Sequence, residues 1–232
     1  MSTNALIVGA GEGISAAFAR ALAKDGARVV LAARDANKLA GLVQEIGAVA
    51  LPCDVSKPGD VASLFSRVDA QLGTLDVVLF NASARARGPL VDLVPDDVAN
   101  ALTVGAFGGF LVGQEAARRM LPRGSGAIFF TGASASIKGY PQSAPFAMAK
   151  FALRGLAQSM ARELAPKGIH VAHFVIDGGV ASRDRVAGLP AGIPSDALLD
   201  PEAIAQSYMS VLKQPRSAWT WELELRPYVE KF

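Results

Sequence analysis

The chain has 232 residues, is 51% hydrophobic and 19% charged, and carries a formal charge of +2 at neutral pH. This composition favours one folded domain with a large core, so we expect residues 1–232 to form a single domain. Its apolar stretches are too short to cross a bilayer and its charges are scattered, which argues against membrane and nucleic-acid partners. The start shows no targeting pattern, and we expect a cytoplasmic protein.

The available side chains also argue against a metal site. Cys53 is the only cysteine, which excludes an internal disulfide and a cysteine-based metal cluster. His170 and His173 lie three residues apart in an apolar run. On a strand this spacing directs the two rings to opposite faces, so we expect two structural histidines and no bound metal.

Short apolar runs alternate with helical patterns along the chain. Strands are predicted at residues 5–8, 28–32, 48–51, 77–80, 127–131, 170–176 and 219–225. Helices are predicted at residues 14–25, 36–46, 58–72, 95–120, 146–164 and 201–214. The first six strands are almost continuously apolar, as is typical of a parallel sheet covered on both faces. The pattern predicts an α/β fold, a single-domain doubly wound parallel sheet of about seven strands with helices on both faces.

Two C-terminal segments depart from this pattern. Residues 219–225 alternate between apolar and polar side chains, so we expect one face of the last strand to be buried and the other to be wet. Residues 177–199 form a long irregular stretch that contains several glycines and prolines. Because ligands in open α/β sheets bind beyond the carboxyl ends of the strands, this stretch is a candidate substrate lid.

A glycine-rich loop, GAGEGI at residues 9–14, directly follows the first strand. Gly9, Gly11 and Gly13 allow a tight turn and let bare backbone approach a pyrophosphate. The helix that begins at Ile14 directs its positive end toward the same anion. At the first strand–helix junction of a βαβ pattern, this loop indicates a Rossmann-type domain that binds a nicotinamide dinucleotide.

The end of the second strand bears on which nicotinamide cofactor is used. An acidic residue there would bond the adenosine ribose 2′-hydroxyl and favour NAD, but the sequence has Ala33 followed by Arg34. Arg34 can pair with a 2′-phosphate, whereas Glu12 in the glycine loop would repel one. We expect NADP(H) to be preferred, and NAD(H) remains the alternative.

These features and later motifs resemble the short-chain dehydrogenase/reductase family over essentially the whole chain. The family's T-G-x-x-x-G-x-G opening corresponds to residues 8–15, and its N-N-A-G segment resembles residues 80–83. The resemblance implies cofactor contacts beyond the glycine loop, including a backbone contact of Val180 with the nicotinamide carboxamide. The positions implied in this way are Asp54, Val55, Asn81, Ala82, Lys150, Gly178 and Val180.

The catalytic part of the family pattern is altered. The family uses Y-x-x-x-K on the helix after the fifth strand, where the lysine lowers the pKa of the tyrosine and the tyrosine passes a proton to the carbonyl oxygen. Here the motif has Phe146 and Lys150, so the lysine is kept and the usual proton donor is lost. The family's serine corresponds to Ala133, and its supporting asparagine aligns with Gly105.

Side chains in neighbouring loops are candidates for the missing roles. Tyr140 and Ser134 lie between the fifth strand and the helix of Lys150, and either is a candidate substitute proton donor. Four arginines are expected at the carboxyl edge of the sheet near Phe146, where they would clamp an acidic small-molecule substrate or remain solvated loop charges. They are Arg85, Arg87, Arg183 and Arg185.

Four glycines, Gly105, Gly108, Gly109 and Gly113, occupy the helix predicted at residues 95–120. Each costs about 1 kcal/mol relative to alanine in a helix interior, and close approach of another backbone would offset that cost. In the family this helix and the next form subunit interfaces, so the resemblance implies a homodimer or homotetramer. Packing within one subunit is the alternative.

Three functions remain open. The first is an NAD(P)-dependent oxidoreductase that transfers a hydride to or from a carbonyl or alcohol with a non-standard or impaired proton donor. The second is a catalytically silent NADP-binding sensor or scaffold, and the third is a lyase or isomerase on the same fold. The cofactor pattern favours the enzyme, whereas the absent tyrosine favours the silent protein.

Overall fold

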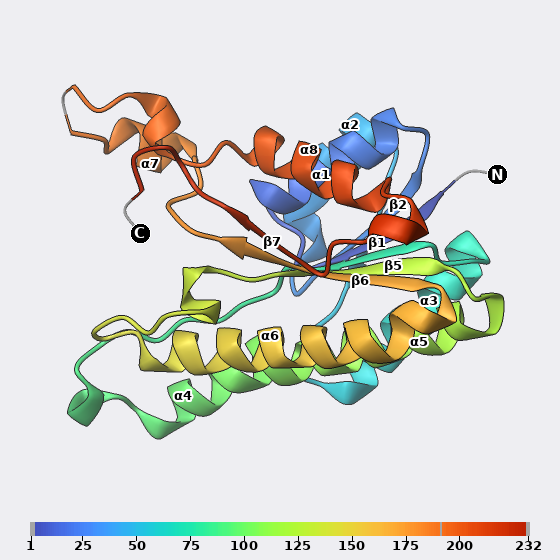
Figure 1. Cartoon of the computed structure of the whole chain (residues 1–232), viewed down its shortest axis with the longest axis horizontal. Helices are drawn as coiled ribbons and strands as arrows, with labels where there is room; N and C mark the ends of the chain where they lie inside the picture. Colours follow the sequence, from blue (N-terminus) through green and yellow to red (C-terminus); the bar gives the residue numbers. More distant parts are fainter. Residues whose placement is uncertain (1–2, 191, 231–232) are drawn as a thin grey trace.

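The computed structural model describes residues 3–190 and 192–230, which form one seven-stranded sheet (Figure 1). All neighbouring strands are parallel, and their spatial order is β3-β2-β1-β4-β5-β6-β7. The order reverses between β1 and β4, which is where an open α/β sheet forms its ligand crevice. The strands are β1 (Asn4–Val8), β2 (Arg28–Ala33), β3 (Val49–Pro52), β4 (Val77–Phe80), β5 (Gly126–Thr131), β6 (Ile169–Ile176) and β7 (Glu222–Leu225).

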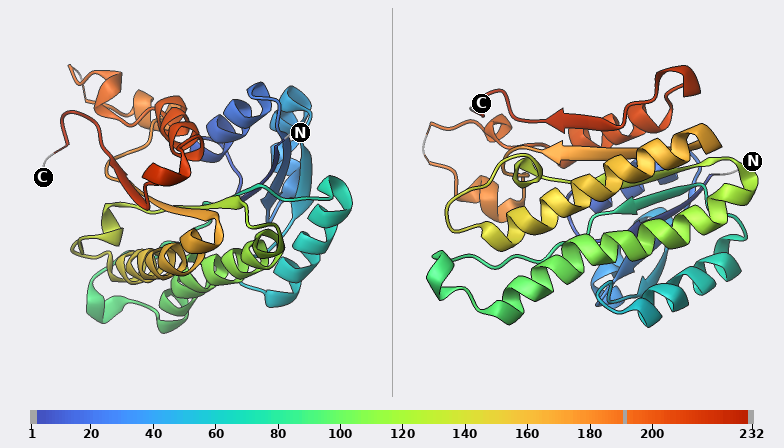
Figure 2. Two further views of the ribbon diagram at one scale, coloured as in Figure 1. Left: turned by 45° about the vertical axis from the view of Figure 1, so that its right-hand side comes forward. Right: turned by 60° about the horizontal axis from the view of Figure 1, so that its bottom comes forward.

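Helices cover both faces of the sheet, as Figures 1 and 2 show. One face carries α1 (Ile14–Lys24), α2 (Ala40–Ile46) and α8 (Pro201–Leu212), and the other carries α3 (Pro58–Leu72), α4 (Pro95–Leu102), α5 (Gly108–Met120) and α6 (Ala144–Leu164). Two hydrophobic clusters fill the two interfaces between sheet and helices. This arrangement confirms the predicted doubly wound α/β fold. None of the helices in the described residues is long and apolar enough to span a membrane.

The parallel register brings the carboxyl ends of the strands to one edge. Val8 of β1 lies level with Ala32 of β2 and Phe80 of β4. The segments that follow these strands, including the glycine loop, therefore emerge side by side. The same edge carries α7 (Arg183–Ala187), which belongs to the long stretch after β6 (Figure 1). Backbone hydrogen bonds hold the two ends of that stretch together. The Ala181 amide donates to the Leu199 carbonyl oxygen, and the Leu199 amide donates to the Gly179 carbonyl oxygen, each at 2.8 Å.

The helix predicted at residues 95–120 is divided. A π-helical segment, Thr103–Phe107, separates α4 from α5. The sequence predicted that another backbone would approach the glycines of this helix. The structure instead places side chains of α6 from the same chain against them. A Cβ at Gly105 would lie 3.0 Å from Ala149, and one at Gly109 would lie 2.5 Å from Leu153. These two glycines are therefore accounted for by packing within the subunit.

The last strand is shorter than predicted. Strand β7 begins at Glu222, because the Gln214 side chain bonds both the amide and the hydroxyl of Thr220 at 2.8 Å and holds the preceding residues as a turn. Glu222, which the alternating pattern assigned to the wet face, instead bonds Arg154 of α6 and His173 of β6. The predicted separation of the two histidines is confirmed, since His170 stacks on Trp219 on the opposite side of β6.

Candidate active site

The glycine loop forms a cradle of bare backbone at the end of β1. Gly9 has φ of +79°, and a Cβ there would lie 2.3 Å from the backbone nitrogen of Ala82. Gly13 has φ of +91° and immediately precedes α1, whereas a Cβ at Gly11 would meet no atom within 4 Å. The backbone conformation of the loop therefore requires glycine at Gly9 and Gly13, whereas the space in front of Gly11 is open.

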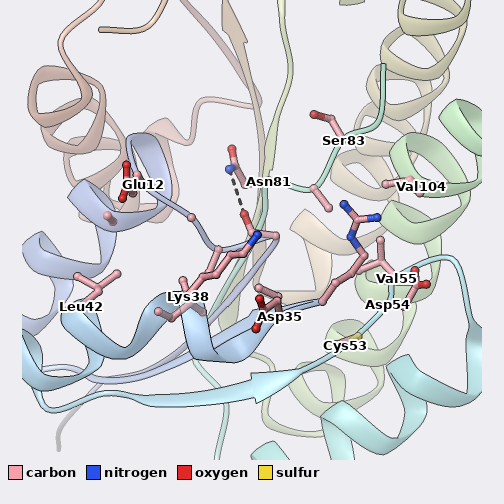
Figure 3. Close-up of a pocket in the computed structure, with 18 of the residues that line it drawn as sticks. Glu12, Asp35, Lys38, Leu42, Cys53, Asp54, Val55, Asn81, Ser83 and Val104 are labelled. Carbon is pink, nitrogen blue, oxygen red and sulfur yellow. Dashed lines mark hydrogen bonds between the residues drawn. The ribbon is translucent and has the colours of Figure 1, made fainter. Parts of the chain in front are cut away.

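Side chains from two elements hold this loop in place. Asn81 Nδ2 donates to the carbonyl oxygen of Gly9 at 3.3 Å and to Ser15 Oγ at 2.8 Å. Ser15 Oγ in turn donates to the Gly9 carbonyl at 3.2 Å. Figure 3 shows Asn81 beside the cavity from the end of β4. The family motif pointed to Asn81, but nothing in the sequence singled out Ser15, since its role depends on the bond to Asn81.

A cavity of about 1070 Å³ opens in front of the glycine loop. Most of the predicted cofactor residues line it, namely Gly9, Gly11, Arg34, Asp54, Val55, Asn81 and Ala82. The Asp54 carboxylate accepts bonds from the amide and hydroxyl of Ser56 at 3.0 and 2.7 Å, which lower its pKa and keep it ionised. The cavity thus combines open backbone amides with a fixed acceptor.

Charged side chains also line this cavity, and Figure 3 shows Glu12 of the glycine loop together with Asp35 and Lys38. Asp35, which the sequence reading passed over, follows Arg34 and caps the next turn by accepting from the amide of Asn37 at 3.1 Å. Within the described parts of the chain, no carboxylate forms an ion pair with Arg34 or Lys38. Both cations thus remain available to an anion.

A second cavity, of about 640 Å³, lies between the loops after β4, β5 and β6. Lys150 is 3% exposed and lines it, and its Nζ donates to the carbonyl oxygen of Thr131 at 2.7 Å. Burial, with a contribution from the charge of Arg85, lowers the pKa of Lys150 to about 7. The Phe146 ring lies one helical turn earlier, with its centroid 5.8 Å from Nζ.

The remaining predicted site residues distribute unevenly around this second cavity. Ile14, Ser134, Tyr140, Gly178 and Val180 line it together with Ala133. Gly13 lines neither cavity, although it shapes the loop between them. Asn81, Ser83 and Arg85 line both cavities, so the two adjoin and form one extended cleft along the carboxyl edge.

Three of the four predicted arginines reach the second cavity. Arg85 stacks over the Phe146 ring at 4.3 Å, Arg185 donates to the Val180 carbonyl at 3.0 Å, and Arg87 also lines the wall. Arg183 is exposed at the start of α7 and lines neither cavity, because α7 turns its side chain away from the cleft. Partial burial and the charges of Arg87 and Arg185 lower the pKa of Arg85.

A buried polar cluster behind the second cavity was not anticipated. His173 Nδ1 lies 3.0 Å from Glu222, whose carboxylate also accepts two bonds from Arg154 at 2.6 and 2.8 Å. A Cβ at Gly132 would lie 2.3 Å from His173 Nε2. Burial lowers the pKa of His173 to about 4 despite its carboxylate partner. The histidine is structural, as the sequence indicated, but it supports the wall of the candidate site.

A family model described as short chain dehydrogenase matches residues 3–184. The chain belongs to the short chain dehydrogenase family. It is 38% identical to the crystal structure of a short-chain dehydrogenase from Rhodopseudomonas palustris, with a TM-score of 0.84 and coverage of 97% of this chain and 99% of that one.

Two further relatives of this short chain dehydrogenase have more specific names. The alcohol dehydrogenase from the archaeon Thermococcus sibiricus complexed with 5-hydroxy-NADP is 26% identical, with a TM-score of 0.86 and coverage of 100% of this chain and 99% of that one. The cis-4-hydroxycyclohexanecarboxylate dehydrogenase of Sinomonas cyclohexanicum is 34% identical over 216 residues, which cover 88% of this chain and 86% of the relative.

Proposed function

We propose that this short chain dehydrogenase is an NADP(H)-dependent oxidoreductase that transfers a hydride to or from a carbonyl or alcohol with a non-standard proton donor. The observation that carries the proposal is the extended cleft, in which the glycine cradle at one end leads to buried Lys150 at the other. An elongated dinucleotide fits such a cleft, since its pyrophosphate meets open backbone amides and its two ends meet separate cavities.

Each part of the cleft has a role in holding the cofactor. The amides around Gly11 and the start of α1 bind the pyrophosphate, and Arg34 with Lys38 binds the 2′-phosphate. Following the family pattern, Asp54 and Val55 lie along the adenine, and Lys150 bonds the nicotinamide ribose. The bound cofactor supplies the hydride. The relative complexed with 5-hydroxy-NADP supports the phosphorylated form.

The proton path is the unusual feature of the proposal. Phe146 and Ala133 occupy the positions of the family's tyrosine and serine, and neither side chain can donate a proton. Lys150 holds a proton at Nζ, and its pKa of about 7 suits proton exchange near neutral pH. The hydroxyls of Ser134 and Tyr140 line the same cavity and are the alternative donors.

The stretch at residues 177–199, of which residue 191 lies outside the described residues, acts as a substrate lid in this proposal. Val180 and Arg185 belong to it and line the second cavity. Its base is tied by the bonds between Ala181, Leu199 and Gly179, so only the part around α7 is left to close over a ligand. Closure would exclude water from a substrate bound beside Lys150.

A second copy of the chain is the expected partner. Large apolar side chains remain exposed on adjacent helices, since Phe107 stacks on Phe110 at 6.0 Å and α6 exposes Met148 and Phe151. A homodimer or homotetramer would cover this face. Light scattering tests this point, and a monomeric mass at micromolar concentration would reject it.

Cofactor binding is tested by titrating the purified protein with NADPH and NADH and following nicotinamide fluorescence. We expect NADPH to bind more tightly, and Arg34→Ala to weaken NADPH by about tenfold while leaving NADH unchanged, because it removes one charge-assisted contact to the 2′-phosphate. Tighter binding of NADH would overturn the NADP preference, and absence of binding would overturn the function.

Turnover is tested with a panel of aldehydes, ketones and keto acids, including 4-oxocyclohexanecarboxylate, by following NADPH consumption. This keto acid is the oxidised form of the compound in the name of the Sinomonas relative. We expect slow turnover that increases by roughly two powers of ten in the double variant Phe146→Tyr, Ala133→Ser, because a general acid typically contributes at least this much. Unchanged turnover in the double variant would contradict the altered proton path.

A silent cofactor-binding sensor is the second candidate, and the loss of both hydroxyls at Phe146 and Ala133 favours it. The same experiments separate the two candidates. Tight NADPH binding with no consumption across the panel, in both the wild type and the double variant, would identify the sensor. Conversion of a substrate without net change in NADPH would identify a lyase or isomerase.

A further inference from the structure

We propose that the second cavity binds a substrate through a carboxylate group, which Arg87 and Arg185 hold together with Arg85. The role of this site in catalysis rests on the proposed function, but anion binding by the site does not. The substrate class that follows is a carbonyl or alcohol compound with an apolar body and a carboxylate at a distance from the reacting carbon.

The charged side chains that line the second cavity support the binding of an anion. Among the described residues, three arginines line it, namely Arg85, Arg87 and Arg185, together with Lys150, whose pKa of about 7 leaves it only partly charged near neutral pH. The carboxylates among these lining residues are Asp177 and Glu230. Asp177 is buried and already lies 3.3 Å from both Lys138 and Arg226. The arginines alone outnumber the two carboxylates, so the wall keeps an excess of positive charge, and a bound anion would relieve it.

The arginines are also arranged to leave donors free. The Arg85 guanidinium lies over the Phe146 ring, with Cζ 4.3 Å from the ring centroid, and within the described residues none of its N–H groups donates a hydrogen bond. Arg185 donates one hydrogen bond, from Nη1, to the Val180 carbonyl oxygen. No ion pair to a carboxylate occupies Arg85, Arg87 or Arg185 in the parts of the chain that the structure describes. A guanidinium with free edges matches the two oxygens of a carboxylate.

Apolar side chains line the same cavity and define the rest of the ligand. Phe146, Ala133, Ala135 and Pro141 contribute to its wall. Phe146 is 8% exposed and cannot donate a hydrogen bond, so the surface between Lys150 and the arginines favours a hydrocarbon body. A ring or short aliphatic chain beside it would place the carboxylate toward the arginines and the oxygen-bearing carbon toward Lys150.

The phosphates of the cofactor are the other source of negative charge near these arginines. Arg85 lines both cavities and can serve either ligand, whereas Arg87 and Arg185 line only the second. A substitution at Arg87 therefore distinguishes the two sources, since Arg185 also bonds the Val180 carbonyl. If Arg87 served the cofactor, its loss would weaken NADPH binding; if it serves a substrate carboxylate, NADPH affinity would not change.

The test compares cyclohexanecarboxylate with cyclohexanecarboxamide, which share the ring and differ in charge. Binding of each is measured by calorimetry at low salt, with the protein saturated with NADPH. We expect the carboxylate to bind about tenfold more tightly, since it forms charge-assisted bonds. Arg87→Gln and Arg185→Gln should each weaken the carboxylate by about tenfold and leave the amide unchanged. Arg87→Gln should also leave NADPH binding unchanged, whereas Arg185 bonds the Val180 carbonyl and is not used for that comparison. Arg67→Gln, at an exposed position of α3 outside both cavities, is the matched control.

Three outcomes would overturn the proposal: equal binding of carboxylate and amide, no binding of either, or weakened NADPH binding in Arg87→Gln with carboxylate binding unaffected. Failure of the proposed function is recognised separately. If the protein does not bind NADPH, the two ligands are compared without cofactor. Selective, arginine-dependent carboxylate binding would then sustain the anion site while the oxidoreductase is rejected, and its absence would reject both.

Discussion

The two cavities of the cleft differ in how they would hold a ligand. The first offers the backbone of the glycine loop, which needs glycine at Gly9 for a positive φ and presents open space at Gly11, and charged side chains also line it. The second is formed by side chains that project from α6 and three loops. A backbone site constrains sequence over several consecutive positions, whereas a side-chain site can change one residue at a time without disturbing the fold.

The polar and apolar groups of the cleft also differ in what they hold. Asn81 and Lys150 each bond a backbone carbonyl at the end of a strand, that of Gly9 and that of Thr131. They therefore hold the edge of the sheet as well as facing the cleft. In the proposed function, Phe146 and Ala133 stand where the family pattern has hydroxyls that serve the reaction. A change at such positions would alter the chemistry and leave the architecture intact.

The strongest test of this contrast uses two glycines of the same loop. Gly9→Ala should lower the free energy of unfolding by about 4 kcal/mol and abolish NADPH binding, because the new Cβ would collide with the Ala82 backbone at a positive φ. Gly11→Ala should leave stability nearly unchanged and still weaken NADPH at least tenfold, because its methyl group enters the space of the pyrophosphate. Urea denaturation and NADPH titration measure both quantities.

Gly155→Ala is the matched control for this pair. Gly155 is exposed in α6, and a Cβ there would meet no atom within 4 Å. This variant should gain up to about 1 kcal/mol from helix propensity and bind NADPH normally. Normal NADPH affinity in Gly11→Ala would show that the loop does not approach a pyrophosphate, and would remove the main support for the first cavity.

A second test addresses the charge of Lys150. Its pKa is about 7 in the folded protein and near 10.5 when unfolded, so the unfolded chain binds more protons between these values. Stability should therefore rise with pH, by about 1.5 kcal/mol between pH 7 and 8.5. Lys150→Met should remove this rise. The comparison stops at pH 8.5 because of Cys53. Burial raises the pKa of its thiol to about 12, so at higher pH this group makes the free energy of unfolding fall as the pH rises.

Denaturation curves at several pH values provide the measurement. If the free energy of unfolding of the wild type did not change between pH 7 and 8.5, burial would not disfavour the charged form of Lys150. Lys150 would then resemble an ordinary solvated lysine, and its assignment as a proton donor near neutral pH would have to be abandoned.

The sequence predicted the first cavity better than the second. The spacing of Gly9, Gly11 and Gly13 limits the backbone to few conformations, so the turn could be inferred locally. Arg183 and Arg185 were indistinguishable in sequence, yet only Arg185 lines the cavity, because the direction of α7 decides which side chain faces it. Such a direction depends on tertiary packing and has no local signature.

Long-range contacts also explain the errors at the C-terminus. Glu222 was placed on a wet face by its alternation with Trp221 and Leu223, which is the expected pattern for an edge strand. Its carboxylate instead meets Arg154 and His173, which lie 68 and 49 residues away in sequence. The periodicity of one strand carries no information about which side chains of other elements its residues will bond.

The smallest predicted effect concerns the cluster that supports the second cavity. His173 is neutral in the fold, because burial and the charges of Lys150 and Arg154 outweigh its Glu222 partner and lower its pKa to about 4. The unfolded chain therefore binds an extra proton between about pH 6.5 and 4, so this contribution to stability is complete above pH 6.5 and is lost as the pH falls. Relative to His173→Gln, the wild type should lose about 1 kcal/mol more between pH 6.5 and 5.5. Parallel curves for the two proteins would mean that His173 titrates normally, and that the wall behind Gly132 is open to water.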